Sequence, residues 1–164
     1  MSKFALTNEA KIKPLRDEVN PSKTVALGFA WEDLFVGQQA SFEHTFSRQD
    51  VATFSKLSGD VSPLHTDDEY ASSKGYREVL LHGLLTASLI SRLIGMHLPG
   101  KTNLCHSQSL DYVNPAYAGE VLRVEGRIVE KNEALRVLVI KIEIRKQNGQ
   151  MVLRGAAQVG VRNE

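Results

Sequence analysis

Hydrophobic and polar positions alternate in five stretches of the chain. In the first, from residue 40 to 46, Phe42 and Phe46 lie on one side and Glu43 on the other, as a half-buried strand requires. The same two-residue period recurs at 103–112, 121–130, 134–146 and 151–161. Asn148-Gly149 lies between the last two stretches and predicts a tight hairpin turn. The C-terminal part of the chain is therefore predicted to contain four successive strands.

Two short helices are predicted between the first strand and residue 75. Ser47 precedes hydrophobic residues that recur at helical spacing from Val51 to Leu57, and serine is a preferred N-cap residue. A second helix is predicted over 66–71, with Thr66 as its N-cap and Gly75 at its end.

One longer helix is predicted over 82–96, before Pro99-Gly100. This stretch is apolar nearly all round, which is typical of a helix buried inside a protein. A single apolar helix and several alternating strands are best satisfied by an antiparallel sheet wrapped around the helix. The predicted fold class is therefore α+β.

Composition narrows the class of protein. The 164 residues suffice for one domain, with 42% hydrophobic residues, 24% charged residues and a formal net charge of +1. These values do not favour disorder, binding to nucleic acid or binding to a membrane surface. Cys105 is the only cysteine, which excludes an internal disulfide and fits a reducing compartment. Since no apolar run reaches the roughly 18 residues of a membrane span, we expect a cytoplasmic protein.

A candidate for chemistry lies in the turn between the two short helices. Asp60 and His65 are separated by Pro63, which fixes its own φ and disfavours the α conformation for the residue before it. The two side chains are therefore expected at the ends of a bent segment. A carboxylate and an imidazole near one water can perform general acid–base catalysis. A polar turn that only caps a helix explains the same residues about equally well.

Several motifs in the chain resemble the MaoC-like dehydratases, a family that includes the (R)-specific enoyl-CoA hydratases. They are FSRQDV at 46–51, LSGDVSPLHTD at 57–67, HGLL at 82–85, SLDY at 109–112 and PAYAGE at 115–120. The resemblance implies a hot-dog fold over 35–164, after an N-terminal extension over 1–34. It also implies a homodimer with an acyl tunnel along the subunit interface.

The resemblance implies a reaction and roles for particular residues. Asp60 and His65 would activate a water that adds to C3 of a trans-2-enoyl thioester, carried by coenzyme A or by acyl-carrier protein, to give an (R)-3-hydroxyacyl thioester. The backbone N–H of Gly83 would stabilise the thioester oxygen, and Ser91 would lie near the water. No metal or other cofactor is implied. Ser62 replaces the asparagine that is common before the proline in this family, which is consistent with a different substrate.

Other interpretations remain open at the level of sequence. His82 is a second candidate base, although a histidine at the start of a buried helix is more often structural. Ser91 could equally be a helix residue whose hydroxyl only donates a hydrogen bond to the backbone of its own helix. A thioesterase, or a non-catalytic subunit that binds acyl thioesters, would have the same fold. The presence of both Asp60 and His65 favours the hydratase.

Overall fold

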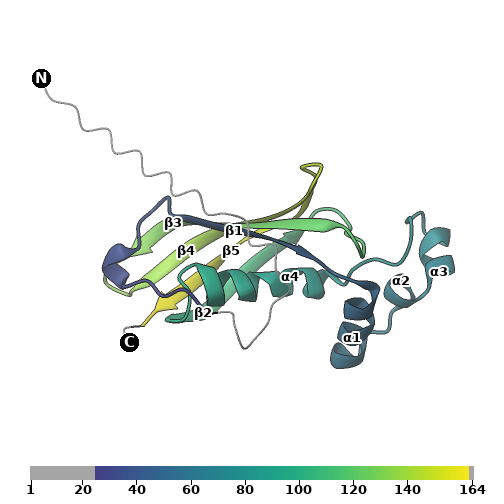
Figure 1. Ribbon diagram of the computed structural model, residues 1–164, viewed down its shortest axis with the longest axis horizontal. Helices are drawn as coiled ribbons and strands as arrows, with labels where there is room; N and C mark the ends of the chain where they lie inside the picture. Colours follow the sequence, from purple (N-terminus) through teal and green to yellow (C-terminus); the bar gives the residue numbers. More distant parts are fainter. Residues whose placement is uncertain (1–24, 163–164) are drawn as a thin grey trace, which may run out of the picture.

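The computed structural model describes residues 25–162, which form one five-stranded antiparallel sheet with helices against it (Figure 1). The strand order is β1-β3-β4-β5-β2. The strands are β1 (Gln39–Thr45), β2 (Asn103–Tyr112), β3 (Val121–Asn132), β4 (Val137–Lys146) and β5 (Met151–Val161). All five predicted strands are present. β4 begins three residues later than predicted, because residues 133–136 form the turn after β3.

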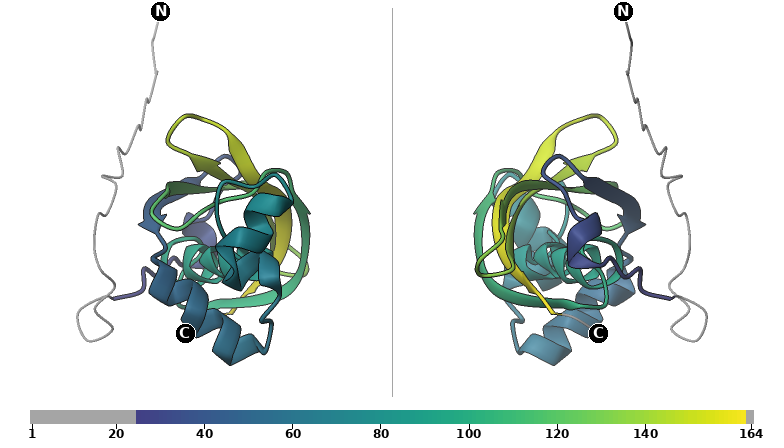
Figure 2. Two further views of the ribbon diagram at one scale, coloured as in Figure 1. Left: turned by 90° about the vertical axis from the view of Figure 1, so that its right-hand side faces the viewer. Right: turned by 90° about the vertical axis from the view of Figure 1, so that its left-hand side faces the viewer.

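The sheet curls around the helix α4 (Gly83–Arg92), as the end-on views in Figure 2 show. The helix continues as one π-helical segment, η2 (Leu93–His97). Fully buried side chains of β3 and β4, among them Ile128 and Ile142, face the helix as a continuous core. This arrangement is the hot-dog fold and confirms the predicted α+β class.

One side of α4 is not buried, contrary to the prediction of a helix covered all round. Leu84, Ser88 and Ser91 are exposed, and their spacing of four and three residues places them on one face. Leu84 is 68% exposed, so this leucine is not part of the core.

Three short helices project together beyond one end of the sheet (Figure 1). They are α1 (Arg48–Ser58), α2 (Pro63–Thr66) and α3 (Asp68–Ser73). Ser47 caps α1 as predicted, in a reciprocal capping box with Asp50. The prediction for the next helix was wrong in detail: α2 was missed, and Asp67 rather than Thr66 accepts the N-terminal hydrogen bonds of α3.

The segment before β1 packs on the domain where the structure describes it. Leu27 donates its N–H to Met96 and accepts from Lys101, while Trp31 and Leu34 are 5% and 1% exposed. Residues 1–24, most of the predicted extension, lie outside the described residues, so the boundary at residue 34 stays a prediction. Within 25–162 no helix is long and apolar enough to cross a membrane. The cytoplasmic location also stays a prediction.

Candidate active site

The turn that carries Asp60 is fixed by its own backbone and side chains. Helix α1 ends at Gly59, whose φ of 77° lies in the left-handed region that favours glycine. Ser58 Oγ accepts the N–H of Asp60 at 3.2 Å, and Asp60 Oδ1 accepts the N–H of Ser62 at 3.2 Å. Ser62 is extended, as expected before a proline, and Pro63 opens α2. The Asp60 carboxylate is therefore tethered through one oxygen and remains exposed.

His65 is oriented by a hydrogen bond to the main chain. Its Nδ1 lies 2.9 Å from the carbonyl oxygen of Leu80, and because a carbonyl can only accept, Nδ1 carries the proton. The N–H of Leu80 in turn donates to the carbonyl of Leu64, at 2.9 Å. This pairing leaves Nε2 of a neutral His65 as a proton acceptor.

His82, which the sequence left open as a second candidate base, joins the same group. The rings of His65 and His82 are stacked, with centroids 3.9 Å apart and planes inclined by 26°. One potential ligand atom from each of Asp60, His65 and His82 lies within 4.8 Å of the others. His82 occupies the N-cap position of α4, but its side chain makes no capping hydrogen bond.

These three side chains could in principle hold a divalent cation, but their hydrogen bonds fit that role poorly. His82 Nε2 lies 3.0 Å from the main-chain oxygen of Asp60, so it acts as a donor and has no lone pair for a metal. The lone pair of His82 is then on Nδ1, which is buried away from the surface of the site, so His65 Nε2 and the Asp60 carboxylate are the two accessible ligands. Two side-chain ligands are fewer than the three of a typical catalytic zinc site.

Gly83 begins α4 directly after His82. The first N–H groups of a helix have no partner within it, so the start of α4 offers donors beside the Asp60 and His65 turn. A Cβ at Gly83 would lie 3.0 Å from Cε1 of Tyr112, so the glycine lets this aromatic ring approach the helix. Ser91 is eight residues further on, about 12 Å along the helix axis. The structure does not bring Ser91 into contact with Asp60 or His65, and its role stays a prediction.

A pocket of about 360 Å³ opens beside His65. Its walls are mainly apolar, with two basic side chains among them. The residues that line it are Arg48, Val51, Ala52, Ser55, Lys56, Val61, His65, Thr66 and Val79. An apolar pocket that contains one imidazole can accept an acyl chain next to a proton acceptor.

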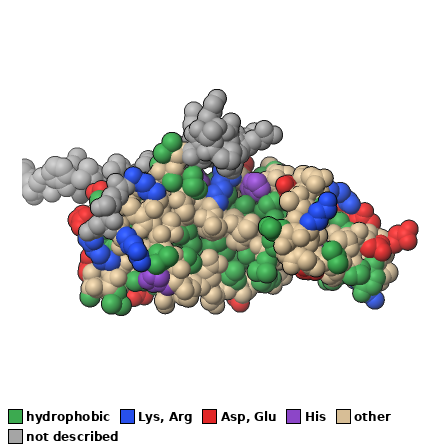
Figure 3. Space-filling model, turned by 90° about the horizontal axis from the view of Figure 1, so that it is seen from below, with side chains coloured by type: hydrophobic (Ala, Val, Ile, Leu, Met, Phe, Trp, Pro, Cys, Tyr) green, Lys and Arg blue, Asp and Glu red, His purple; other side chains and the backbone are tan. Residues whose placement is uncertain are grey.

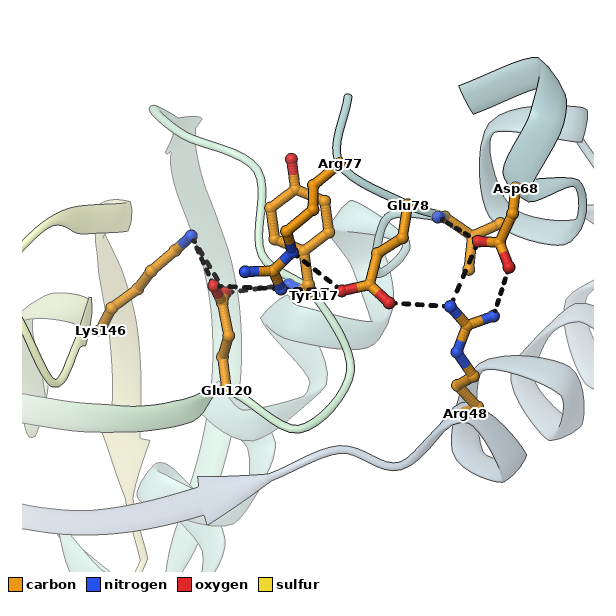
Figure 4. Close-up of polar contacts among 8 residues, drawn as sticks. Arg48, Asp68, Arg77, Glu78, Tyr117, Glu120 and Lys146 are labelled. Atoms are coloured by element: carbon orange, nitrogen blue, oxygen red, sulfur yellow. Dashed lines mark hydrogen bonds and ion pairs between the residues drawn. The ribbon is translucent and has the colours of Figure 1, made fainter. Parts of the chain in front are cut away.

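Arg48 ties the projecting helices together (Figure 4). Its guanidinium lies 2.8 Å from Asp68 at the start of α3 and 2.7 Å from Glu78 in the loop before α4. Asp68 also accepts the N–H of Val79, at 2.9 Å. These contacts hold the wall of the pocket against α1.

The chain of ion pairs continues to the sheet (Figure 4). Arg77 lies 2.8 Å from Glu78 and 3.6 Å from Glu120, which is 3.0 Å from Lys146. The guanidinium of Arg77 also covers the ring of Tyr117, 4.2 Å from its centroid. Side chains far apart in the sequence thus connect the projecting helices to β4.

The Arg48 pairs are sensitive to acid. The hydrogen bond from Arg48 holds the pKa of Asp68 below its ordinary value of 3.8 and that of Glu78 below 4.5. A carboxyl group with a lowered pKa stabilises the fold above its ordinary value, and this contribution is lost as the pH falls through the lowered pKa. Because Arg48 and Asp68 are half exposed, the contribution of this pair is small.

Fold and site together describe a hot-dog domain with a carboxylate and an imidazole at the start of its central helix. The family model described as MaoC like domain matches residues 35–148, and the chain belongs to this family. It is 34% identical to the (R)-specific enoyl-CoA hydratase of Aeromonas caviae over 128 residues, which cover 78% of this chain and 96% of the relative. It is 33% identical to a mitochondrial 3-hydroxyacyl-[acyl-carrier-protein] dehydratase of Solanum lycopersicum, over 76% of this chain and 75% of the relative.

Two solved structures that resemble this chain are also named as (R)-hydratases. The A. caviae (R)-hydratase superposes with a TM-score of 0.77 at 33% identity, covering 80% of this chain and 99% of that one. The unliganded R-hydratase PhaJ1 from Pseudomonas aeruginosa gives 0.79 at 29% identity, covering 85% and 89%. The recognition of the family from its motifs is confirmed.

Proposed function

We propose that the protein is a hydratase that adds water reversibly to a trans-2-enoyl thioester and forms an (R)-3-hydroxyacyl thioester. The observation that carries this proposal is the orientation of His65, whose Nδ1 is engaged by Leu80 while its ring lies beside the Asp60 carboxylate. The relatives named as (R)-specific hydratases and as a dehydratase support the same reaction.

In the proposed reaction, Asp60 and His65 bind one water between them. His65 Nε2 takes a proton from the water while the water oxygen forms a bond to C3 of the enoyl group. The electrons of the C2–C3 double bond move to the thioester oxygen, which becomes negatively charged. The proton is then delivered to C2, so that H and OH are added across the double bond.

The thioester oxygen needs a hydrogen-bond donor at this stage. We assign this role to the backbone N–H of Gly83, because a helix N-terminus combines unpaired donors with a favourable dipole. Ser62 contributes by fixing the carboxylate through its N–H. The pocket beside His65 would hold part of the substrate.

A direct assay tests the proposed function. We expect loss of enoyl absorbance with crotonyl-, octenoyl- or branched enoyl-CoA, and an (R)-configured product on chiral analysis. The same acyl groups on acyl-carrier protein distinguish the two carriers. An enzyme that only hydrolyses the thioester would release free thiol instead. Absence of hydration with every carrier and chain length would refute the proposal.

We also propose that two copies of the chain form a homodimer through β2 and α4. The strand β2 lies at the edge of the sheet, and eight of its ten residues are exposed. Proteins usually cover or shorten an edge strand, because its unpaired backbone groups can pair with another chain. The exposed Leu84 and Tyr112, at 68% and 51%, belong to α4 and β2. Hydrophobic side chains also gather in the middle of the face that Figure 3 shows.

Light scattering at micromolar concentration is expected to give about twice the mass of one chain. Leu84→Glu should convert the protein to monomers, because a buried charge would oppose the interface, while a glutamate in the first turn suits the helix itself. Leu135→Glu is the matched control, since Leu135 is 72% exposed in the turn after β3. A wild-type monomer with full activity would contradict the proposal.

A further inference from the structure

His82 is almost completely buried, yet it lies within the group that we assign to catalysis. It is 2% exposed, and its ring contacts both His65 and Phe54, with centroids 3.9 Å and 5.0 Å away. A buried polar side chain is costly unless its hydrogen bonds are satisfied. Packing alone would be served better by an apolar ring.

The hydrogen bonds of His82 assign the position of its proton. Nε2 lies 3.0 Å from the main-chain oxygen of Asp60 and 3.3 Å from Oγ of the buried Ser55. The Asp60 oxygen can only accept, so Nε2 carries the proton. Nδ1 is buried and has no hydrogen-bond partner among the described residues. A proton on Nδ1 would have no acceptor there, which favours the tautomer protonated at Nε2.

We propose that His82 is a positioning residue for the hydration reaction. Its Nε2–H holds the main chain at Asp60, and with it the carboxylate, so that carboxylate and His65 imidazole face one water. The stacked rings carry their protons at opposite nitrogens, Nε2 in His82 and Nδ1 in His65. This inference rests on the proposed function, but its geometry can be tested without substrate.

Three substitutions separate positioning from packing. Glutamine places an amide N–H as many bonds from the backbone as Nε2, whereas asparagine has the same chemistry but is one bond shorter, and phenylalanine keeps the ring without a donor. If His82 acts through its hydrogen bond, His82→Asn and His82→Phe lower kcat by about 10- to 100-fold with KM changed less than about threefold. His82→Gln should retain most of the wild-type kcat. His44→Phe controls for loss of a histidine outside the site.

A structural role would give a different order. Phe would then be the best replacement, and Gln and Asn would be equally poor. Wild-type kcat in a folded His82→Phe variant, or equal kcat for Gln and Asn, overturns the proposal.

Nitrogen-15 NMR of the imidazole rings tests the geometry in the wild-type protein, whether or not the variants fold. The expected result is a neutral Nε2–H tautomer for His82 and an Nδ1–H tautomer for His65. An Nδ1–H tautomer for His82 would overturn the inference. Failure of the proposed function would instead appear as a wild-type protein that has these tautomers but hydrates no enoyl thioester.

Discussion

Asp60→Asn and His65→Gln are each expected to lower kcat on enoyl thioesters by about 10²- to 10⁴-fold, the usual contribution of a general acid or base. Asparagine keeps the size of Asp60 and its acceptor for the N–H of Ser62, but it removes the charge. Glutamine keeps a polar group in place of His65 without a nitrogen that titrates. Because substrate binding depends on other groups, KM should change much less than kcat.

The double variant should be little worse than the worse single variant. The two side chains act on one water, and groups that act as a unit are not additive. Asp33→Asn and His44→Gln are matched controls, since they make the same chemical changes outside the site. Circular dichroism and light scattering check fold and assembly.

A folded Asp60→Asn or His65→Gln variant that keeps more than about a tenth of wild-type kcat would refute the assignment of the active site. In another outcome, both single variants lose kcat as expected while the loss in the double variant equals the product of the two single fold losses. The side chains then act on separate steps rather than on one water.

The features predicted best from sequence depend on residues close together in the chain. The period of two in β1 to β5 and the N-cap at Ser47 are local patterns, so the structure reproduces them. The extended backbone at Ser62 follows directly from Pro63. The bend between Asp60 and His65 could therefore be predicted.

The features that were missed depend on contacts between distant residues. The N-cap of α3 is Asp67 and not the predicted Thr66, because Thr66 is the last residue of helix α2, which was missed. His82 meets His65 only after the intervening loop folds back, with the Leu80 N–H bonded to Leu64. Neither pairing has a local signal. The His-Gly start of α4 was the only available hint, and it supported a capping role as well.

The exposed stripe on α4 was also missed for a physical reason. An apolar sequence does not say whether a helix is covered by its own chain or by a second copy. Leu84 is exposed here, and the proposed dimer would cover it.

The close approach of α4 and its π-helical extension to the sheet underlies the last prediction. Gly126 lies on the inward face of β3, between Ala40 of β1 and Ile142 of β4. A Cβ at this position would lie 2.6 Å from Cδ2 of Leu93, a side chain with no exposed surface. Real atoms cannot stay at this separation, so the core would have to move.

Gly126→Val is therefore expected to lower the free energy of unfolding by about 1–3 kcal/mol, the usual cost of overpacking a core. This cost must exceed the roughly 0.5–1 kcal/mol that removal of a strand glycine would otherwise gain. Urea unfolding measures the change. Gly95→Ala is the control, because its Cβ would meet nothing closer than Asn103 Nδ2 at 3.9 Å.

A double variant identifies the cause. Leu93→Ala alone should cost about 2–5 kcal/mol through the cavity it leaves. If the clash with Leu93 is the reason for the glycine, Leu93→Ala combined with Gly126→Val should lose at least about 0.5 kcal/mol less than the sum of the single losses, because the valine fills space that the leucine vacates. Strict additivity would mean that Gly126 is required for some other reason, such as the curvature of β3.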